Sequence, residues 1–382
     1  MQLRLSLAAA ALLSAAAAQA EDYINVQYMY YDENSGTTVS TPMFEINKDF
    51  GTDDTVNFTF THDTVSGASP TWYDSSTGAS SVVPPGTVDP GDLAYDYLPY
   101  DDRRQAYALS YTHRFASRDQ LTVGGNYSDE NDYTAREISA EYLLNLDRSR
   151  NRTLSLGVSW QHNDVTAFCG EHAWVCDGSS GGSPKAVTEN LDVVTTQVGF
   201  TQILDSTSVA KISLFYIGED GYLSNPYMNV VRDYDTGNPF LAPERKPDSR
   251  TAWGTVFEYS KALDRLAVHL SYRFYDDDWE IRSHTFDGRA YYTLSPAFTV
   301  GAGLRYYTQS AADFYHAGKD CFTDEKYASS DRRMSEFDAT DYNLGGTWRI
   351  SDTVSVNANV DYYIQYDHFD AMYYNIGFRY LF

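Results

Sequence analysis

The feature that most constrains the fold is a strict two-residue alternation of apolar and polar side chains over residues 354–366. One set of positions holds apolar or aromatic residues: Val354, Val356, Ala358, Val360, Tyr362, Ile364 and Tyr366. Such a period places alternate side chains on opposite faces of a β-strand. Strands of soluble proteins usually span about five or six residues, whereas a tilted strand crossing a bilayer needs about nine to eleven. The pattern therefore predicts a membrane-spanning strand with one lipid-facing side.

The final segment repeats this alternation and finishes on an aromatic residue. Six apolar or aromatic residues share one face: Met372, Tyr374, Ile376, Phe378, Tyr380 and Phe382. A terminal strand of this kind resembles the assembly signal of bacterial outer-membrane proteins. We therefore expect the strand ending at Phe382 to be recognised by the barrel-assembly machinery, and outer-membrane lipid and lipopolysaccharide to surround the folded chain.

The first twenty residues have the pattern of a secretory signal peptide. Arg4 precedes the apolar run Leu5–Ala18, and Ala18-Gln19-Ala20 provides the small residues of a cleavage site. The alternative is a short N-terminal membrane helix, for which the apolar run is too brief. We expect residues 1–20 to be removed near Ala20 and residues 21–382 to form one domain in the outer membrane of a Gram-negative bacterium.

The remaining alternating segments predict an all-β fold, a transmembrane up-and-down antiparallel barrel of about sixteen strands, with fourteen or eighteen as alternatives. Seven short polar turns alternate with eight other connections, and the four longest cover 65–102, 164–190, 220–249 and 311–335. This alternation is typical of short periplasmic turns and longer external loops. The 33 tyrosines suit the aromatic girdles of such a barrel.

Charge excludes one class of partner. The formal net charge is −25, and nucleic-acid binding requires clustered Lys and Arg. Acidic loops either bind divalent cations and lipopolysaccharide phosphates or simply keep the surface soluble.

Strand parity places several charged side chains in the lumen. Three arginines on consecutive strands are expected to form a basic ladder at mid-height, and three carboxylates also point inward: Arg273, Arg289, Arg305, Asp287, Asp361 and Glu141. One interpretation is a transverse field at a constriction, with the arginines opposite carboxylates such as Asp361, which selects small polar solutes. The other is a packed salt-bridge network in a plugged barrel.

Three cysteines follow the signal segment. Cys169 and Cys176 share one predicted loop, and a local disulfide between them suits an oxidising envelope. A metal site using both thiolates and His172 is the alternative, although no second ligand pair is evident. Cys321 is left over. We predict neither a resident metal nor a cofactor.

Catalytic patterns are weak. His62 and the triplet His162-Asn163-Asp164 lie near predicted strand ends, but the chain has no serine in an elbow motif. We expect no enzymatic activity, and a hydrolase at the barrel rim is the third-ranked hypothesis.

Three further stretches carry a resemblance to a known family: residues 63–70, 305–315 and 329–335. Together they resemble an uncharacterised family of proteobacterial outer-membrane barrels, known as a domain of unknown function. The resemblance implies a barrel without an assigned substrate and supplies no catalytic residues. Its members tend to be encoded near a periplasmic thioredoxin-like protein and a flavin transferase, which implies a periplasmic redox partner.

These stretches also have a meaning of their own, since each lies where a strand meets a long loop. A sharp turn that folds a loop inward is expected at Ser66, Gly67, Ser69 and Pro70. A second group is expected to pin the opposing loop to the wall: Gln309, Asp313, Asp331 and Arg332. Inward folding of both loops would narrow or plug the pore.

The leading functional hypothesis is a porin-like channel for small polar solutes or ions. The alternative is a non-conducting scaffold barrel that serves a periplasmic redox or maturation partner.

Overall fold

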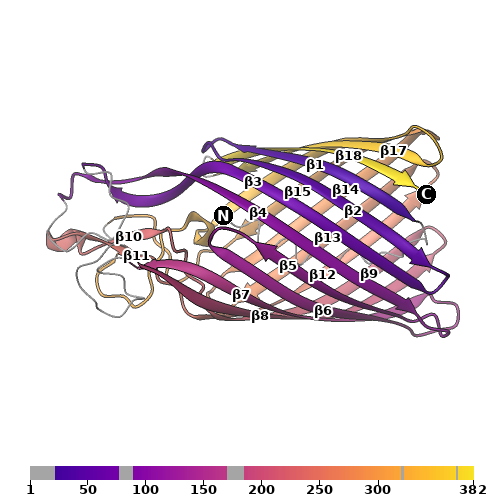
Figure 1. Ribbon diagram of the computed structural model, residues 1–382, viewed down its shortest axis with the longest axis horizontal. Helices are drawn as coiled ribbons and strands as arrows, with labels where there is room; N and C mark the ends of the chain where they lie inside the picture. The colour runs from indigo at the N-terminus through magenta and orange to yellow at the C-terminus, as the bar shows by residue number, and fades with distance from the viewer. Residues whose placement is uncertain (1–21, 77–88, 170–184, 320–321, 367–368) are drawn as a thin grey trace.

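The computed structural model describes residues 22–76, 89–169, 185–319, 322–366 and 369–382. Sixteen antiparallel strands close into one barrel (Figure 1). They are β1 (Tyr23–Glu33), β2 (Thr38–Phe50), β3 (Asp54–Asp74), β4 (Leu93–Arg114), β5 (Gln120–Asp129), β6 (Tyr133–Asn145), β7 (Arg152–Cys169), β8 (Lys185–Asp205), β9 (Ser208–Gly221), β12 (Ser249–Leu263), β13 (Leu266–Asp277), β14 (Arg282–Ser295), β15 (Phe298–Gln309), β16 (Phe337–Arg349), β17 (Val354–Gln365) and β18 (Phe369–Leu381).

The ring closes where β1 pairs with β18, with Tyr23 opposite Leu381. Seven short turns and eight other connections alternate around the ring, so the predicted up-and-down topology and strand number are confirmed. All the short turns lie at the right-hand end of Figure 1, together with the C-terminus. We refer to this as the periplasmic end, because short turns mark that side of outer-membrane barrels.

Four smaller elements lie in the long connections: β10 (Asn229–Arg232), η1 (Tyr234–Thr236), β11 (Phe240–Pro243) and η2 (Arg332–Met334). β10 and β11 form a separate two-stranded sheet. Among the described residues, no helix is both long and apolar enough to span a membrane.

One predicted loop is largely strand. β3 continues to Asp74 and β4 starts at Leu93, and the two strands pair without interruption from Asp54–His113 out to Asp74–Leu93. The predicted sharp turn at Ser66, Gly67, Ser69 and Pro70 is therefore wrong. Each strand supplies the backbone partners of the other, so the chain extends as a hairpin beyond the barrel (Figure 1).

The barrel wall alternates as the sequence predicts, with large apolar side chains outward. Leu344 is 67% exposed and Ile138 is 62% exposed on the outer surface, which in a membrane contacts lipid. Polar side chains point inward, and several inward glycines leave space for their neighbours. Gly254 is the clearest case, because an added Cβ would lie 2.2 Å from the backbone oxygen of Phe274 and 2.4 Å from the Phe215 ring.

We therefore expect Gly254→Val to impair barrel assembly, with a loss of roughly 1–3 kcal/mol from overpacking. Urea-induced unfolding in lipid vesicles would measure this loss. Gly288→Val is the matched control, because its Cβ would lie at an ordinary 3.5 Å from Leu270 on the lipid face. Equal stability of the two variants would contradict the close approach at Gly254.

Candidate functional site

The lumen has a charged wall on strands β14–β17. The Asp287 carboxylate lies between two guanidinium groups, 3.3 Å from Arg289 Nε and 3.2 Å from Arg305 Nε. The strand register continues this row, since Arg305 pairs with both Asp287 and Asp341. Positive and negative side chains therefore alternate around this wall at one level of the barrel.

Arg273 is held differently from the other two arginines. Its guanidinium lies over the Phe215 ring at 4.8 Å and over the Tyr275 ring at 5.9 Å. The wide inward space at Gly254 makes room for Phe215, because that ring occupies the volume where a side chain would stand. This is a cation–π arrangement rather than a rung of a simple ladder.

Not all the inward carboxylates face the arginines. Asp361 is on β17, two strands from Arg305 on β15, and accepts a 2.7 Å hydrogen bond from Asn343. The expectation that Asp361 lies opposite the arginines is therefore wrong. Strand parity tells whether a side chain points inward or outward, but not where around the ring its strand lies. Glu141 does lie across the lumen, because β6 is seven strands from β15 around the ring.

Glu137, which the sequence analysis missed, lies on the same strand as Glu141 and accepts a 3.0 Å hydrogen bond from Asn126. Its inward parity on β6 was a usable signal. The two walls thus differ in charge, with arginines on β13–β15 and two glutamates on β6.

Solvent reaches the arginine wall. The side chain of Arg305 is 49% exposed and that of Arg289 is 37% exposed, although both point inward. Strands β3–β8, which lie across the lumen from the arginines, present small or polar inward side chains such as Thr59, Ser110 and Gly157. At this level the described side chains leave the guanidinium groups of Arg289 and Arg305 partly uncovered.

An ordered assembly, here called the cap, lies at the opposite end from the short turns (Figure 1). The cap consists of residues 222–248, 310–319 and 322–336 and of the outer hairpin of β3 and β4, residues 67–74 and 93–100. The β10–β11 sheet lies at its centre and is covered on both faces. Val231 and Leu241 pack on Trp72 and Leu93 of the hairpin.

The opposite face of the same sheet carries Val230 and Ala242, which pack on Phe322 and Ala328. Arg232 donates hydrogen bonds of 3.0 Å each to the carbonyl oxygens of Thr323 and Glu325. The cap therefore has a core of its own, made from three connections that are far apart in the sequence.

A buried charge cluster joins the two long connections of the cap. Lys246 Nζ lies 3.3 Å from Glu244 and 3.3 Å from Asp331, and all three side chains are almost completely buried. Arg333 pairs with Asp331, and the Ser329 hydroxyl donates to Glu244. Each buried charge thus has a partner, as burial requires.

The cluster has opposite effects on its two carboxyl groups. Burial raises the pKa of Glu244, which Lys246 offsets only in part. Burial also opposes ionisation of Asp331, but the charges of Arg333 and Lys246 prevail and hold the pKa of Asp331 well below 3.8. Folding thus favours the neutral form of Glu244 and the ionised form of Asp331.

The cap is therefore expected to lose stability below about pH 3.8, because Asp331 must then be protonated against its folded-state preference. Glu244 acts in the opposite sense: it makes the cap more stable as the pH falls toward 4.5. Hydrogen exchange of residues 222–248 between pH 3 and 7 would measure both effects. Glu244→Gln should remove the gain in stability as the pH falls toward 4.5 and keep the loss below about pH 3.8. Protection of the wild type that does not change with pH would contradict this assignment.

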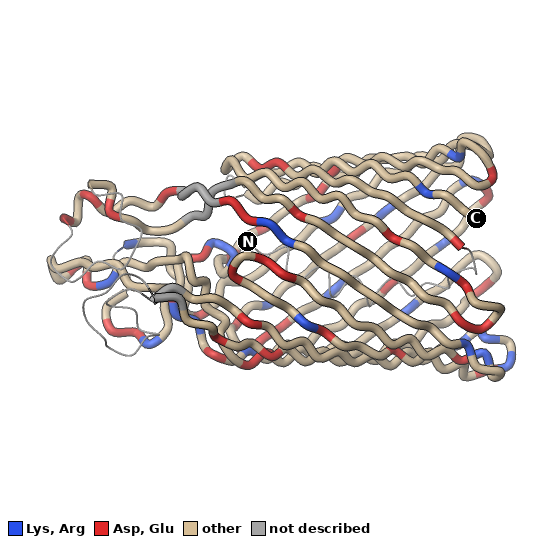
Figure 2. The backbone as a smooth tube through the Cα atoms, in the orientation of Figure 1, with Lys and Arg blue, Asp and Glu red and all other residues tan. Residues whose placement is uncertain are grey.

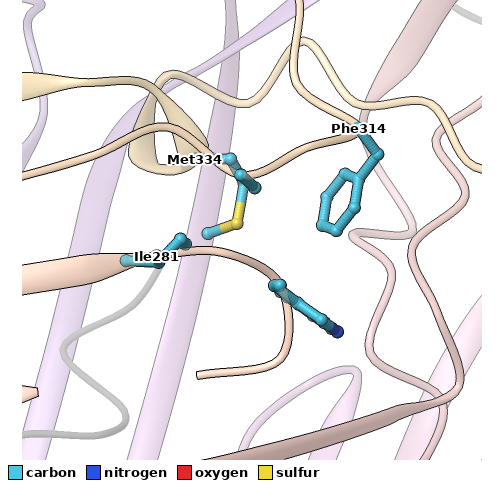
Figure 3. Close-up of a cluster of buried hydrophobic side chains, with 5 residues drawn as sticks. Ile281, Phe314 and Met334 are labelled. Atoms are coloured by element: carbon cyan, nitrogen blue, oxygen red, sulfur yellow. The ribbon is translucent and has the colours of Figure 1, made fainter. Parts of the chain in front are cut away.

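An apolar cluster anchors the cap to the barrel rim. Trp279, in the β13–β14 connection, packs with Ile281, Ala312, Phe314 and Met334 (Figure 3). Its ring meets that of Phe314 edge-on at 5.1 Å.

The same tryptophan is fixed from the barrel side. The indole Nε1 donates a 3.0 Å hydrogen bond to the carbonyl oxygen of Ser249. The Arg250 guanidinium lies 4.6 Å from its ring and donates a 2.8 Å hydrogen bond to Asp277. Trp279 therefore connects the barrel wall to the cap core.

The predicted pinning residues lie at this junction. Gln309 donates hydrogen bonds of 3.0 and 2.6 Å to the carbonyl oxygens of Arg333 and Ser335. The Arg332 guanidinium lies 5.3 Å from the Tyr95 ring of the hairpin. The backbone N–H of Asp313 donates to the Trp279 carbonyl oxygen at 3.2 Å. These contacts join β15 to the loop through Gln309 and the loop to the hairpin through Arg332.

A cavity of about 150 Å³ remains between the cap and the wall of β6–β9. Its lining includes Asn163 and Glu219 of the barrel and Tyr222 and Lys246 of the cap.

Two further groups concern metal and catalytic hypotheses. Asp102, Glu130 and Asp132 have carboxylate oxygens within 4.8 Å of one another, a group that sequence analysis missed because strand pairing brings it together. His162 has Nδ1 at 2.9 Å from Asp192 and Nε2 at 3.8 Å from Asp164, so both ring nitrogens face carboxylates.

Cys176 and Cys321 lie outside the described residues, as does the side chain of Cys169, and the disulfide between Cys169 and Cys176 stays a prediction.

The closed ring, the apolar outer face and the polar lumen define a sixteen-stranded β-barrel of the outer-membrane class. The chain belongs to the family described as a protein of unknown function, DUF3570, whose model matches residues 2–375. No curated protein sequence matches it.

The structural comparison finds solved outer-membrane barrels at low sequence identity. CdiB from Acinetobacter baumannii is 10% identical with a TM-score of 0.50, over 95% of this chain and 60% of CdiB. The CymD monoaromatic hydrocarbon channel is 12% identical with a TM-score of 0.41, over 96% of this chain and 89% of CymD. Pseudomonas aeruginosa OccK8 (OprE) is 7% identical with a TM-score of 0.44, over 94% and 98% of the two chains. This chain thus spans about 60% of CdiB but nearly the whole of OccK8.

Proposed function

We propose that the protein is a channel for small polar solutes or ions, with the arginine wall as its charge filter and the cap at its outer mouth. The observation that carries this proposal is the solvent exposure of inward side chains, with Arg305 at 49%. A plugged barrel would bury such a side chain at this level.

The distribution of charge supports selection as well as passage. Arginines on β13–β15 face Glu137 and Glu141 on β6 across a space lined by small polar residues. Opposed rows of fixed charge orient dipolar solutes and bias the passage of ions. Arg289 and Arg305 both lie beside the Asp287 carboxylate, and Asp341 is opposite Arg305 in the strand register, so positive and negative groups alternate along this wall.

Liposome swelling with lysine, glutamine and glutamate of similar size tests the proposal. The wild type should admit all three solutes, and Arg305→Ala should raise the rate of lysine relative to glutamate by several-fold, because one positive charge leaves the lumen. Lys261→Ala is the matched control, since it removes a positive charge at the outer face of β12, where Lys261 pairs with Asp205. Impermeable liposomes containing the folded barrel would overturn the proposal.

A further inference from the structure

The periplasmic end carries a concentrated basic surface on two adjacent turns. Residues 114–119 and 146–152 contain five arginines and two aspartates: Arg114, Arg118, Arg148, Arg150, Arg152, Asp119 and Asp147. The whole chain has 28 basic residues against 53 acidic ones, so this balance is the reverse of the overall composition. Blue segments gather at the lower right of the barrel in Figure 2.

Hydrogen bonds join the two turns into one surface. The Asn145 side chain donates a 2.8 Å hydrogen bond to the Arg118 carbonyl oxygen, and its backbone N–H donates a 2.8 Å bond to Asp119. Asp147 accepts from the Ser149 hydroxyl and from the Arg152 backbone N–H. Both carboxylates therefore shape the turns, and Asp147 also lies 4.0 Å from Arg152 Nε. Arg118, Arg148, Arg150 and Arg152 remain exposed.

Two of these arginines occupy backbone positions that suit other residues. Arg118 has a φ of 71° and Arg150 has a φ of 57°, in the left-handed region that favours glycine or asparagine. Turn geometry alone would favour glycine at both positions. The arginines are therefore better explained by what their side chains bind than by the turns that they form.

Apolar side chains border the basic surface on the lipid side. Phe115 is 37% exposed and Leu146 is 46% exposed, and both continue the outward-facing sets of β4 and β6. At a bilayer boundary, apolar side chains contact the acyl chains of a phospholipid, and neighbouring arginines contact its phosphate. The alternative ligand of this basic surface, a soluble acidic protein, would bind the arginines without contacting the apolar border.

We propose that the turns at residues 114–119 and 146–152 form a binding surface for the anionic headgroups of phospholipids in the periplasmic leaflet. The guanidinium groups bind the phosphates, while Phe115 and Leu146 contact the acyl chains beneath them. This surface holds one sector of the barrel against anionic lipid, independently of any conduction through the lumen.

Native mass spectrometry of the detergent-solubilised mature chain tests this assignment, with phosphatidylglycerol and phosphatidylcholine as probes. The wild type should bind phosphatidylglycerol preferentially, and this preference should weaken as salt is raised. The variant Arg118→Asn/Arg148→Gln/Arg150→Gly/Arg152→Gln should lose on the order of tenfold in affinity for phosphatidylglycerol. No preference in the wild type, or an unchanged preference in this variant, would overturn the proposal.

Two controls separate lipid binding from misfolding and from protein binding. Arg150→Gly alone should weaken phosphatidylglycerol binding while the thermal midpoint stays equal or rises, since glycine suits the backbone there. Lys261→Gln/Arg265→Gln, at the end of β12 and on the β12–β13 turn, should leave lipid preference unchanged. If the four-site variant loses binding to poly-glutamate but keeps its phosphatidylglycerol preference, the surface serves an acidic protein and the lipid assignment is wrong.

Discussion

Lys246→Met is expected to open the cap while leaving the barrel assembled. The substitution removes the cation that lies 3.3 Å from both Glu244 and Asp331 and leaves two buried carboxylates with less compensation. Loss of one partner from a buried ion cluster typically costs about 3–5 kcal/mol. Limited proteolysis in vesicles should then cleave within residues 222–248 and 322–336, which the wild type should protect.

The control for this result is a lysine of the same chain that is not buried. Lys261→Met removes an ion pair whose side chains are 29% and 53% exposed, so the cap should stay protected. The double variant Glu244→Gln/Lys246→Met should recover part of the lost stability, since one of the buried negative charges is then removed. Equal protease resistance of Lys246→Met and wild type would show that the cluster does not hold the cap.

Trp279→Ala is expected to detach the cap from the rim. The indole contacts Phe314 and Met334 of the cap and the Arg250 guanidinium of the wall, and truncation of a buried tryptophan typically costs about 3–5 kcal/mol. Hydrogen exchange should rise in residues 310–319 while the strands near Arg305 keep their protection.

Phe314→Leu is the control for Trp279→Ala. It should raise hydrogen exchange less, since it keeps an apolar side chain in the cluster shown in Figure 3. Its expected effect is below that of Trp279→Ala because the hydrogen bond from Trp279 to Ser249 and the contact with Arg250 are kept. A variant at Trp279 that exchanges no faster than wild type would contradict the anchoring role.

The barrel was predictable because its signals are local. Alternation with a period of two is visible within each strand, and the turns between Phe50 and Asp54 or between Ser295 and Phe298 interrupt it with polar or turn-forming residues. Strand parity also placed Arg289 and Arg305 in the lumen. Parity does not tell which strands face each other across the lumen. It therefore did not show that Asp361 lies on the same side of the barrel as the arginines.

The core of the cap and its buried charge cluster were not predictable from the sequence for a physical reason. Lys246 and Asp331 are separated by 85 positions, and each charge alone resembles an ordinary solvated loop residue. β10 and β11 have four residues each, which is too short for a periodic signal. The β3–β4 hairpin contains Gly67 and Pro70, residues that usually mark turns, yet the continuous partner strand keeps them extended.

The most direct test of the central claim is single-channel recording of the mature chain in a planar bilayer under a potassium chloride gradient, with wild type compared with Arg305→Glu. A water-filled lumen with this arginine at its charge filter predicts stepwise openings in both proteins. The reversal potential of the variant should shift toward cation selectivity. A correctly folded wild-type barrel that never conducts, or openings whose reversal potential is the same in both proteins, would contradict the account.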